Sequence, residues 1–282
     1  MTPGNLDPDL LTRGGLRFDV NGFVATITLA RPETKNSQTP ATWQALRAIG
    51  ADLDPAVRVV VICGEGDTFS SGLDRRMLTP EGIEGEATLL QLLDMPDGEL
   101  GETLAGYQEG FTWLRRMDIV SIAAVQGHAI GAGFQLALAC DLRMLADDAV
   151  LSMREPMLGL VPDLTGTKPL VDLVGYSRAL EICGTARSIE AGEAREIGLA
   201  TAVVPREELS AAVADLVSAL TAPLYGAVSE TKALLQSAAV LDLDEQRREE
   251  REAQVRRFRE LAELMATAEQ DDLFYGGTED GG

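Results

Sequence analysis

The chain has 282 residues, which is enough for one large α/β domain with a modest extension and for a substantial buried core. It carries 24 Lys and Arg against 45 Asp and Glu, a formal net charge of -21 at pH 7. Such a surface repels a phosphate backbone, which argues against nucleic-acid binding. With 45% hydrophobic and 24% charged residues, and no apolar run near the roughly 20 residues that span a bilayer, the composition is that of a soluble globular protein without a membrane partner.

The three cysteines are odd in number and lack CxxC spacing. They are Cys63, Cys140 and Cys183, and each lies in an apolar segment. This pattern predicts buried thiols in a reducing compartment rather than a disulfide framework or a zinc site. The first 15 residues are rich in Gly, Pro and Asp and lack the basic and apolar regions of a signal peptide, so we expect a cytoplasmic protein.

Short apolar runs alternate with helical segments along most of the chain. Asn21-Gly22 is a tight-turn dipeptide between two apolar runs and predicts a β-hairpin. Thr39 and Pro40 are typical of a helix start, because a threonine can cap the helix and a proline fits its first turn. The predicted strands are 16–20, 23–29, 57–63, 121–125 and 142–146, and the predicted helices are 39–50, 131–140, 169–183 and 189–197. This alternation favours an α/β fold.

Residues 81–109 contain five glycines, many acidic residues and little periodicity, which predicts a variable insertion or lid. From residue 209 onward the chain is predicted to be helical, and an apolar stripe within 245–268 indicates packing against the core or a neighbouring subunit. The expected organisation is a core at 1–208, defined best over 15–80 and 110–208 with the variable segment between them, followed by a helical region at 209–282 whose last residues, 276–282, are disordered.

Two glycine-containing turns can each present an unpaired backbone N–H. The first, residues 69–74, follows the predicted strand 57–63, and the second, residues 127–133, follows the strand 121–125 and begins a helix. Two such donors converging on one oxygen would stabilise a developing anion, and the positive end of a helix would add to the effect. Small residues before a helix also serve close packing, so either turn alone is compatible with a structural role.

In combination these motifs resemble the crotonase superfamily, the enoyl-CoA hydratase/isomerase family. The resemblance runs from about Phe23 to Pro205, apart from the 81–109 insertion. Its motifs are Arg31-Pro32, Asn36, residues 69–74, residues 126–133, Cys140-Asp141, Glu155, Gly159, Pro162 and Gly166-Thr167. The resemblance implies a spiral of ββα turns and a C-terminal helical region that packs as a homo-oligomer, in trimers or dimers of trimers. It also implies an acyl-CoA thioester as substrate and an oxyanion hole formed by the backbone N–H groups of Leu73 and Ala132.

The hydratases of this family use two glutamates to hold and deprotonate a water, and the resemblance assigns those positions to Gln135 and Glu155. An amide cannot accept a proton at useful pH, although it can orient water or substrate. Asp163 follows Glu155 and makes a carboxylate pair similar to that of the dienoyl-CoA isomerases, which however carry an acid where this chain has Gln135. We therefore expect Glu155 as the principal acid/base, Asp163 as a second proton carrier, and a double-bond shift in an enoyl- or dienoyl-CoA.

Other interpretations stay open at this stage. Hydration by one carboxylate, with Gln135 placing the water, is one alternative, and an acyl-CoA-binding protein without turnover is another. Asp163 is also compatible with a turn residue, and Glu155 with a surface carboxylate paired with Arg154. Gln135 is compatible with an ordinary polar residue in a first helical turn.

The remaining predictions concern binding. Ser71, Gly131, Gln135 and Arg76 are predicted to bind substrate, and Arg75 and Arg76 are candidate cations for the CoA phosphates. His128, the only histidine, is predicted to be packed and hydrogen-bonded rather than catalytic. The chain lacks a nucleotide-binding fingerprint and a metal-ligand cluster, so no cofactor or metal is expected beyond the coenzyme A of the substrate.

Overall fold

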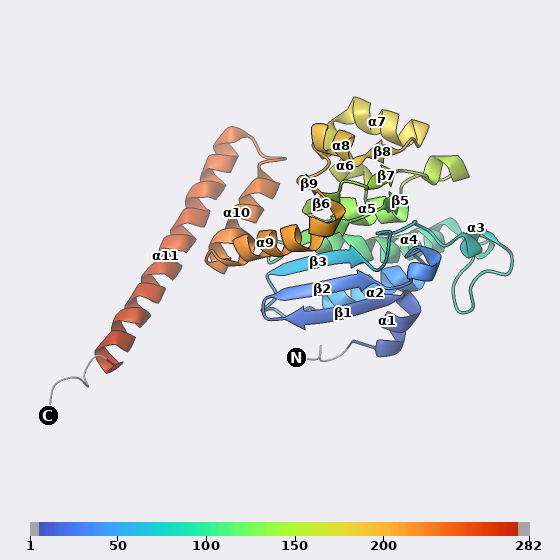
Figure 1. Ribbon diagram of the computed structural model, residues 1–282. Coiled ribbons are helices and arrows are strands. Elements are labelled where there is room, and N and C mark those ends of the chain that lie inside the picture. The colour runs from blue at the N-terminus through green and yellow to red at the C-terminus, as the bar shows by residue number, and fades with distance from the viewer. Residues whose placement is uncertain (1–5, 276–282) are drawn as a thin grey trace. The chain divides into compact units, whose positions relative to one another are not determined.

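The computed structural model describes residues 6–275, the side chains of 268–275 excepted. The chain divides into two compact units, Met1–Thr221 and Ala222–Gly282. The predicted candidate residues all lie in the first unit, which is an α/β arrangement of two sheets covered by helices (Figure 1). Within the described residues, no single helix is both long enough and apolar enough to cross a membrane.

The main sheet has six strands in the order β1-β2-β3-β4-β6-β9. β1 and β2 form the predicted hairpin and are antiparallel, whereas each later neighbour pairs in parallel. The central strand β3 is buried on both faces, which explains why its sequence is a continuous apolar run rather than an alternating one. The strands are β1 Leu16–Asn21, β2 Val24–Leu29, β3 Val59–Gly64, β4 Val120–Val125, β6 Leu142–Ala146 and β9 Ala202–Val204.

A second, three-stranded sheet has the order β5-β7-β8, with β5 His128–Ile130, β7 Val150–Ser152 and β8 Ile189–Glu190. The chain passes from the main sheet to this sheet at Gly127, whose φ is +56°. A Cβ built on Gly127 would lie 2.1 Å from the carbonyl oxygen of Asp67, so only glycine fits there. Residues 127–133 were predicted to form one turn that begins a helix, but the structure places the strand β5 within them. The strand was missed because three residues are too few to show a periodicity.

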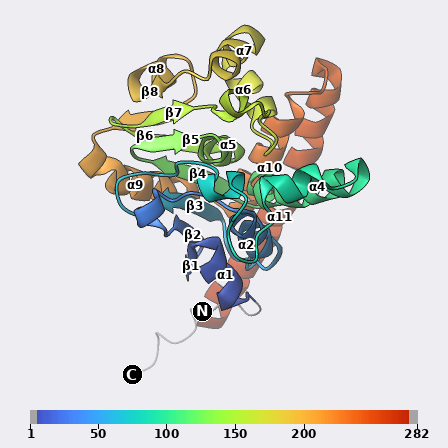
Figure 2. The same cartoon turned by 90° about the vertical axis from the view of Figure 1, so that its right-hand side faces the viewer.

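The helices of the first unit cover both sheets. α2 packs between α1 and α4 (Figure 2), and the Trp43 and Tyr107 rings of α2 and α4 lie 4.9 Å apart. α5 is buried at every residue and packs against β4, β5, α4 and α6. The helices are α1 Pro8–Gly14, α2 Pro40–Ala51, α3 Leu89–Leu93, α4 Asp97–Thr112, α5 Ala132–Ala139, α6 Thr167–Val174, α7 Tyr176–Thr185, α8 Ala191–Glu196 and α9 Leu209–Thr221.

The predicted hairpin, the strands 57–63, 121–125 and 142–146, and the helix that begins at Thr39-Pro40 are confirmed. The predicted helix 169–183 is wrong in its continuity, because Gly175, with φ +78°, separates α6 from α7. The predicted helix 189–197 begins instead as the strand β8, whose pairing with β7 takes the place of a first helical turn.

The segment 81–109, which shows little periodicity in the sequence, is largely helical from Leu89 onward, where α3 and α4 form, and its role as a variable insertion or lid stays a prediction. Tyr107 and Phe111 of α4 are buried in the core. A Cβ built on the neighbouring Gly110 would lie 2.5 Å from the carbonyl oxygen of Trp43. The absence of a side chain at Gly110 therefore lets α4 and α2 approach closely.

The helical region predicted from residue 209 is confirmed as helical. Its first helix, α9, packs on the main sheet through Leu209 and Val213 and belongs to the first unit. In the second unit, α10 Tyr225–Ser237 and α11 Leu243–Tyr275 form a hairpin held by the Arg256–Glu230 ion pair at 2.7 Å. The predicted disordered tail, 276–282, lies outside the described residues, and the packing of the α11 stripe stays a prediction.

Candidate active site

Backbone hydrogen bonds join the two glycine turns that the sequence singled out. Ser70 N donates to the carbonyl oxygen of His128 at 2.8 Å, and Ile130 N donates to the carbonyl oxygen of Ser70 at 3.0 Å. On its other side the first turn is tied to the segment before α2, where Gln38 N donates to the carbonyl oxygen of Gly72 at 2.7 Å. The first turn is therefore fixed between the segment before α2 and β5, and it lies against the second turn.

Within the described residues, neither the Leu73 N–H nor the Ala132 N–H donates a hydrogen bond. Gly72, with φ +83°, brings the two groups together: a Cβ built on it would lie 2.4 Å from the carbonyl oxygen of Ile130 and 3.4 Å from Ala132 N. Ala132 is the first residue of α5, so its N–H lies at the positive end of a helix. Two free main-chain donors thus lie at adjoining turns, and their role as an oxyanion hole stays a prediction.

The carboxyl group of Glu155 lies beside these donors. Glu155 begins the 3-10 helix η4, Glu155–Leu158, which follows β7. Its Oε1 would lie 3.3 Å from a Cβ built on Gly131, the residue just before Ala132. Oε1 accepts a hydrogen bond from Gln135 Nε2 at 2.6 Å, whereas Oε2 is buried and has no partner among the described residues. A buried carboxylate oxygen without a partner is available to take a proton.

Both predicted carboxylates are held in surroundings that favour the protonated form. Burial raises the pKa of Glu155, hydrogen bonds from the backbone and from Gln135 oppose this, and the negative charge of Asp163 raises the pKa further. Burial also raises the pKa of Asp163. The thiol of Cys183, on α7, has a raised pKa because of burial and the charge of Glu155. Buried carboxyl groups with raised pKa values are typical of proton-transfer sites.

Gln135 lies in the first turn of α5 and is 0% exposed. Its Oε1 accepts hydrogen bonds from Leu164 N at 2.8 Å and Gly166 N at 3.3 Å, while its Nε2 donates to Glu155. These contacts satisfy the side chain through protein neighbours, as burial of α5 on every side requires. The predicted contact of Gln135 with substrate stays a prediction.

Asp163 lies in the turn that Gln135 holds. Its backbone carbonyl accepts a hydrogen bond from Gln108 Nε2 of α4 at 2.7 Å, and its side chain is half-buried. No motif pointed to Gln108, because the helix that carries it falls mostly in the 81–109 segment, whose sequence shows little periodicity. Had a helix been predicted at the position of α4, a glutamine on the side of that helix facing the core would have indicated a role for Gln108.

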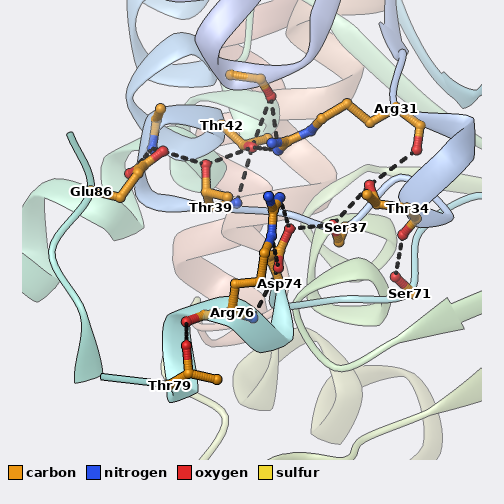
Figure 3. Close-up of polar contacts among 12 residues, drawn as sticks. Arg31, Thr34, Ser37, Thr39, Thr42, Ser71, Asp74, Arg76, Thr79 and Glu86 are labelled. Atoms are coloured by element: carbon orange, nitrogen blue, oxygen red, sulfur yellow. Dashed lines mark hydrogen bonds and ion pairs between the residues drawn. The ribbon is translucent and has the colours of Figure 1, made fainter. Parts of the chain in front are cut away.

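The polar side chains after the first turn form their own network (Figure 3). Arg76 donates to the buried carboxylate of Asp74 through Nη2 at 2.8 Å and Nε at 3.1 Å, and Ser37 Oγ donates to the same carboxylate at 3.0 Å. The Arg76 hydrogen bond lowers the pKa of Asp74 to about 2. Ser71 Oγ donates to the carbonyl oxygen of Thr34 at 3.2 Å.

These contacts bear on two predicted binding residues. The guanidinium charge of Arg76 is balanced by Asp74, which weakens the expectation that Arg76 binds phosphate, although its side chain is 57% exposed. Arg75 is exposed and has no ion-pair partner in the described part of the chain. The hydroxyl of Ser71 is directed to the protein, while Gly131 lies between Glu155 and the free N–H of Ala132.

The prediction that His128 is packed is wrong, because its side chain is exposed, whereas its lack of a catalytic role stays a prediction. On β5 it is Ala129, the next residue, that is buried. Of the predicted buried thiols, Cys140 is fully buried and burial raises its pKa to about 12, while Cys63 and Cys183 are half-buried; all three are free. Among residues 6–267 no group of His, Cys, Asp or Glu is arranged to hold a metal ion.

The two sheets, the spiral connections and the paired glycine turns define the α/β crotonase fold. Residues 19–266 match the family model of the enoyl-CoA hydratase/isomerase family, and the chain belongs to that family. The carnitinyl-CoA dehydratase of Citrobacter koseri is 32% identical over 234 residues, which cover 82% of this chain and 83% of that protein.

Crystal structures of a Thermobifida fusca YX protein assigned as an enoyl-CoA hydratase have the same fold. Its complex with CoA is 52% identical to this chain, with a TM-score of 0.87, and the match covers 93% of this chain and 99% of that one. Its complex with acetoacetyl-CoA is 53% identical, also with a TM-score of 0.87, over 90% of this chain and 99% of that one.

Proposed function

We propose that the protein is an enzyme that acts on an acyl-CoA thioester and shifts a double bond of an enoyl- or dienoyl-CoA by proton transfer. The N–H groups of Leu73 and Ala132 bind the thioester oxygen, and Glu155 carries the proton, with Asp163 as a second carrier. One observation carries this proposal: the unpartnered, buried Oε2 of Glu155 belongs to a carboxyl group that adjoins two free backbone donors. The likeness to a protein solved with acetoacetyl-CoA supports the substrate class.

The reaction needs an enolate to be more stable in the site than the neutral thioester. For a 3-enoyl-CoA, the ionised Glu155 takes a proton from C2, the C2–H pair forms a double bond to C1, and the carbonyl π pair moves to oxygen. The two N–H groups stabilise that oxyanion, and losing one such donor typically costs about 3 kcal/mol. When the enolate collapses, C4 receives the proton and the double bond moves from C3–C4 to C2–C3, so one C–H bond breaks and one forms.

Gln135 favours isomerisation over water addition. It occupies a position where the resemblance to hydratases expects a glutamate, and an amide cannot act as a base. Its Oε1 and one of its N–H bonds are engaged by Leu164, Gly166 and Glu155. Of the positions that the resemblance singles out, Glu155 and Asp163 then carry the carboxyl groups, which is sufficient for a double-bond shift without water.

Hydration or dehydration is a second candidate. The observation that favours it is the similarity to the carnitinyl-CoA dehydratase of Citrobacter koseri. In this reading Glu155 alone activates or protonates the water, and the same two N–H groups bind the enolate oxygen.

Incubation of the purified protein with 3-enoyl-, 3,5-dienoyl- and 2-enoyl-CoA separates the candidates. We expect isomerisation of a 3-enoyl- or 3,5-dienoyl-CoA and slow water addition to 2-enoyl-CoA. Liquid chromatography with mass spectrometry measures the products. Rapid water addition without any isomerisation would overturn the proposal in favour of the second candidate. Calorimetric binding of all three thioesters without turnover would overturn both.

Replacing Glu155 by Gln tests the proposed base directly. We expect kcat to fall by about 10²- to 10⁴-fold, the usual contribution of a general acid–base group, while the Kd of the thioester changes little. Because the pKa of Glu155 is raised, wild-type kcat/KM should fall as the pH drops through an inflection above the ordinary glutamate value of about 4.3.

The matched control for this prediction is Glu84→Gln, which removes an exposed carboxylate with no partner among the described residues. It should leave both kcat and the acidic inflection unchanged. Full activity of Glu155→Gln, with the inflection still present, would assign the proton transfer to another group.

A further inference from the structure

The Gln135 side chain connects two parts of the site that carry carboxyl groups. Nε2 donates to Glu155 Oε1 at 2.6 Å, and Oε1 accepts from Leu164 N at 2.8 Å and Gly166 N at 3.3 Å. The side chain is fully buried, so no solvent competes for these bonds. One amide therefore holds the catalytic candidate Glu155 and also the turn that presents Asp163.

The fit of the turn to this side chain is close. A Cβ built on Gly166 would lie 2.7 Å from Gln135 Cγ and 3.2 Å from its Oε1. The backbone of residues 164–166 thus rests directly on the glutamine, and the absence of a side chain at 166 permits the approach. Both the hydrogen bonds and the packing fix the distance between the turn and α5.

We propose that Gln135 is a positioning residue that fixes the carboxyl group of Glu155 and the Asp163 turn in a single geometry, leaving Glu155 Oε2 as the one oxygen free to exchange protons. This inference rests on the proposed function only in taking Glu155 as the proton carrier. It replaces the expectation that Gln135 binds substrate or water.

Only a neutral side chain with both a donor and an acceptor satisfies this geometry. An apolar residue would leave Glu155 Oε1 and the N–H groups of Leu164 and Gly166 unpaired in a buried place. An ionised glutamate would accept from Leu164 N but would face the Glu155 carboxylate as a second negative charge. The amide meets both neighbours without adding a charge.

The hydrogen bond from Gln135 also sets the proton affinity of Glu155. It favours the ionised carboxylate and opposes the effect of burial on the pKa. The titratable groups that face Glu155 are the Asp163 carboxyl, from the turn, and the Cys183 thiol, from α7. Loss of the Gln135 donor should therefore raise the pKa of Glu155 and move the acidic limb of kcat/KM to higher pH.

Gln135→Met tests the proposal, and Gln108→Met is its matched control. Gln108 donates to the same turn, at the Asp163 carbonyl, but makes no hydrogen bond to Glu155 among the described residues. Two measurements are made on the full chain: the pH profile of kcat/KM, and infrared titration of the carboxyl band that disappears in Glu155→Gln. The second measurement needs no turnover, so it tests the positioning of Glu155 even if the proposed reaction is not the one catalysed.

For Gln135→Met we expect the infrared titration and the kinetic inflection to move together to higher pH by about one unit. We expect kcat to fall by about 10- to 100-fold because the base is displaced, with the thioester Kd within about twofold of wild type. Gln108→Met should leave the two titrations where they are. A weakened Kd with unchanged titrations would show that Gln135 binds substrate, and equal effects in both glutamine variants would show a merely structural role; either result would overturn the proposal.

Gln135→Glu keeps the inference testable if the methionine variant does not fold. A protonated glutamate can keep both contacts, so we expect the two carboxyl groups to share a proton and titrate in two steps, the upper step above that of Glu155 in the wild type. Two independent titrations near the ordinary glutamate value would contradict the proposal, because they would place the two carboxyl groups apart.

Discussion

Gly72 shows, at the scale of a residue, how the backbone alone can bring two free N–H donors close together. Its φ of +83° lies in the left-handed region that favours glycine, and the Ile130 carbonyl oxygen fills the space in which a side chain would lie. The next residue supplies one free N–H, and Ala132, close to Gly72, supplies the other. Any side chain at position 72 would therefore push the two donors apart.

Gly72→Ala should lower kcat by about 10²- to 10³-fold, the usual cost of losing one oxyanion donor. Gly22→Ala is the matched control, because Gly22 also has a positive φ, +58°, but open space around it. The control should lose about 1 to 2 kcal/mol of folding stability from backbone strain and keep its kcat. Thermal unfolding and steady-state kinetics on both variants check this, and a Gly72→Ala enzyme with normal kcat would exclude the proposed oxyanion hole.

At the scale of an element, the start of α2 is completed by a residue far along the chain. Glu86 accepts hydrogen bonds from Thr39 Oγ1 at 2.7 Å and from Ala41 N at 3.0 Å, and so provides an acceptor at the positive end of the helix (Figure 3). Arg31 Nη2 donates to Thr42 Oγ1 at 2.8 Å in the same place. The segment between η2, Arg75–Leu78, and α3 is thereby tied to the first turn of α2.

Glu86→Ala should destabilise the protein by about 0.5 to 2 kcal/mol, the range measured for lost helix caps. The amides of residues 79–88 should also exchange their hydrogens faster, because that segment loses its attachment to α2. Hydrogen exchange by mass spectrometry and chemical denaturation measure the two effects. Glu84→Ala, an exposed neighbour, should change neither, and identical behaviour of the two variants would exclude an anchoring role for Glu86.

At the scale of the whole molecule, charge is the dominant property. A net charge of -21 repels the phosphates of a CoA thioester at long range. In about 0.1 M salt this repulsion is largely screened beyond a distance of about 10 Å. Arg76, one of the two candidate cations near the site, is already balanced by Asp74. The long-range field therefore opposes the approach of the substrate.

We predict that the KM of a CoA thioester falls as KCl is raised from about 50 to about 200 mM. The KM of the corresponding pantetheine thioester, which lacks the nucleotide phosphates, should stay constant over the same range and serves as the control. A KM for the CoA thioester that rises with salt would show that a local group of cations, and not the net charge, governs substrate approach.

The local elements of this protein were predictable because their signals lie within a few neighbouring residues. Asn21-Gly22 specifies the hairpin turn, Thr39-Pro40 specifies the start of α2, and the continuous apolar run of β3 is typical of a buried parallel strand. The motif order was likewise enough to indicate the family to which the chain belongs. Each of these features depends on residues adjacent in the chain, so it needs no knowledge of the fold.

Contacts between distant segments had to be seen in three dimensions. The donor of Gln135 reaches Glu155, Asp74 neutralises Arg76, and Gly110 lets α4 pack on α2. The residue types at these positions are compatible with several partners, and the partner is chosen only when the sheets and helices bring particular segments together. Burial then removes water as an alternative partner, and for this reason the partners of these side chains, unlike the family, came from the tertiary structure.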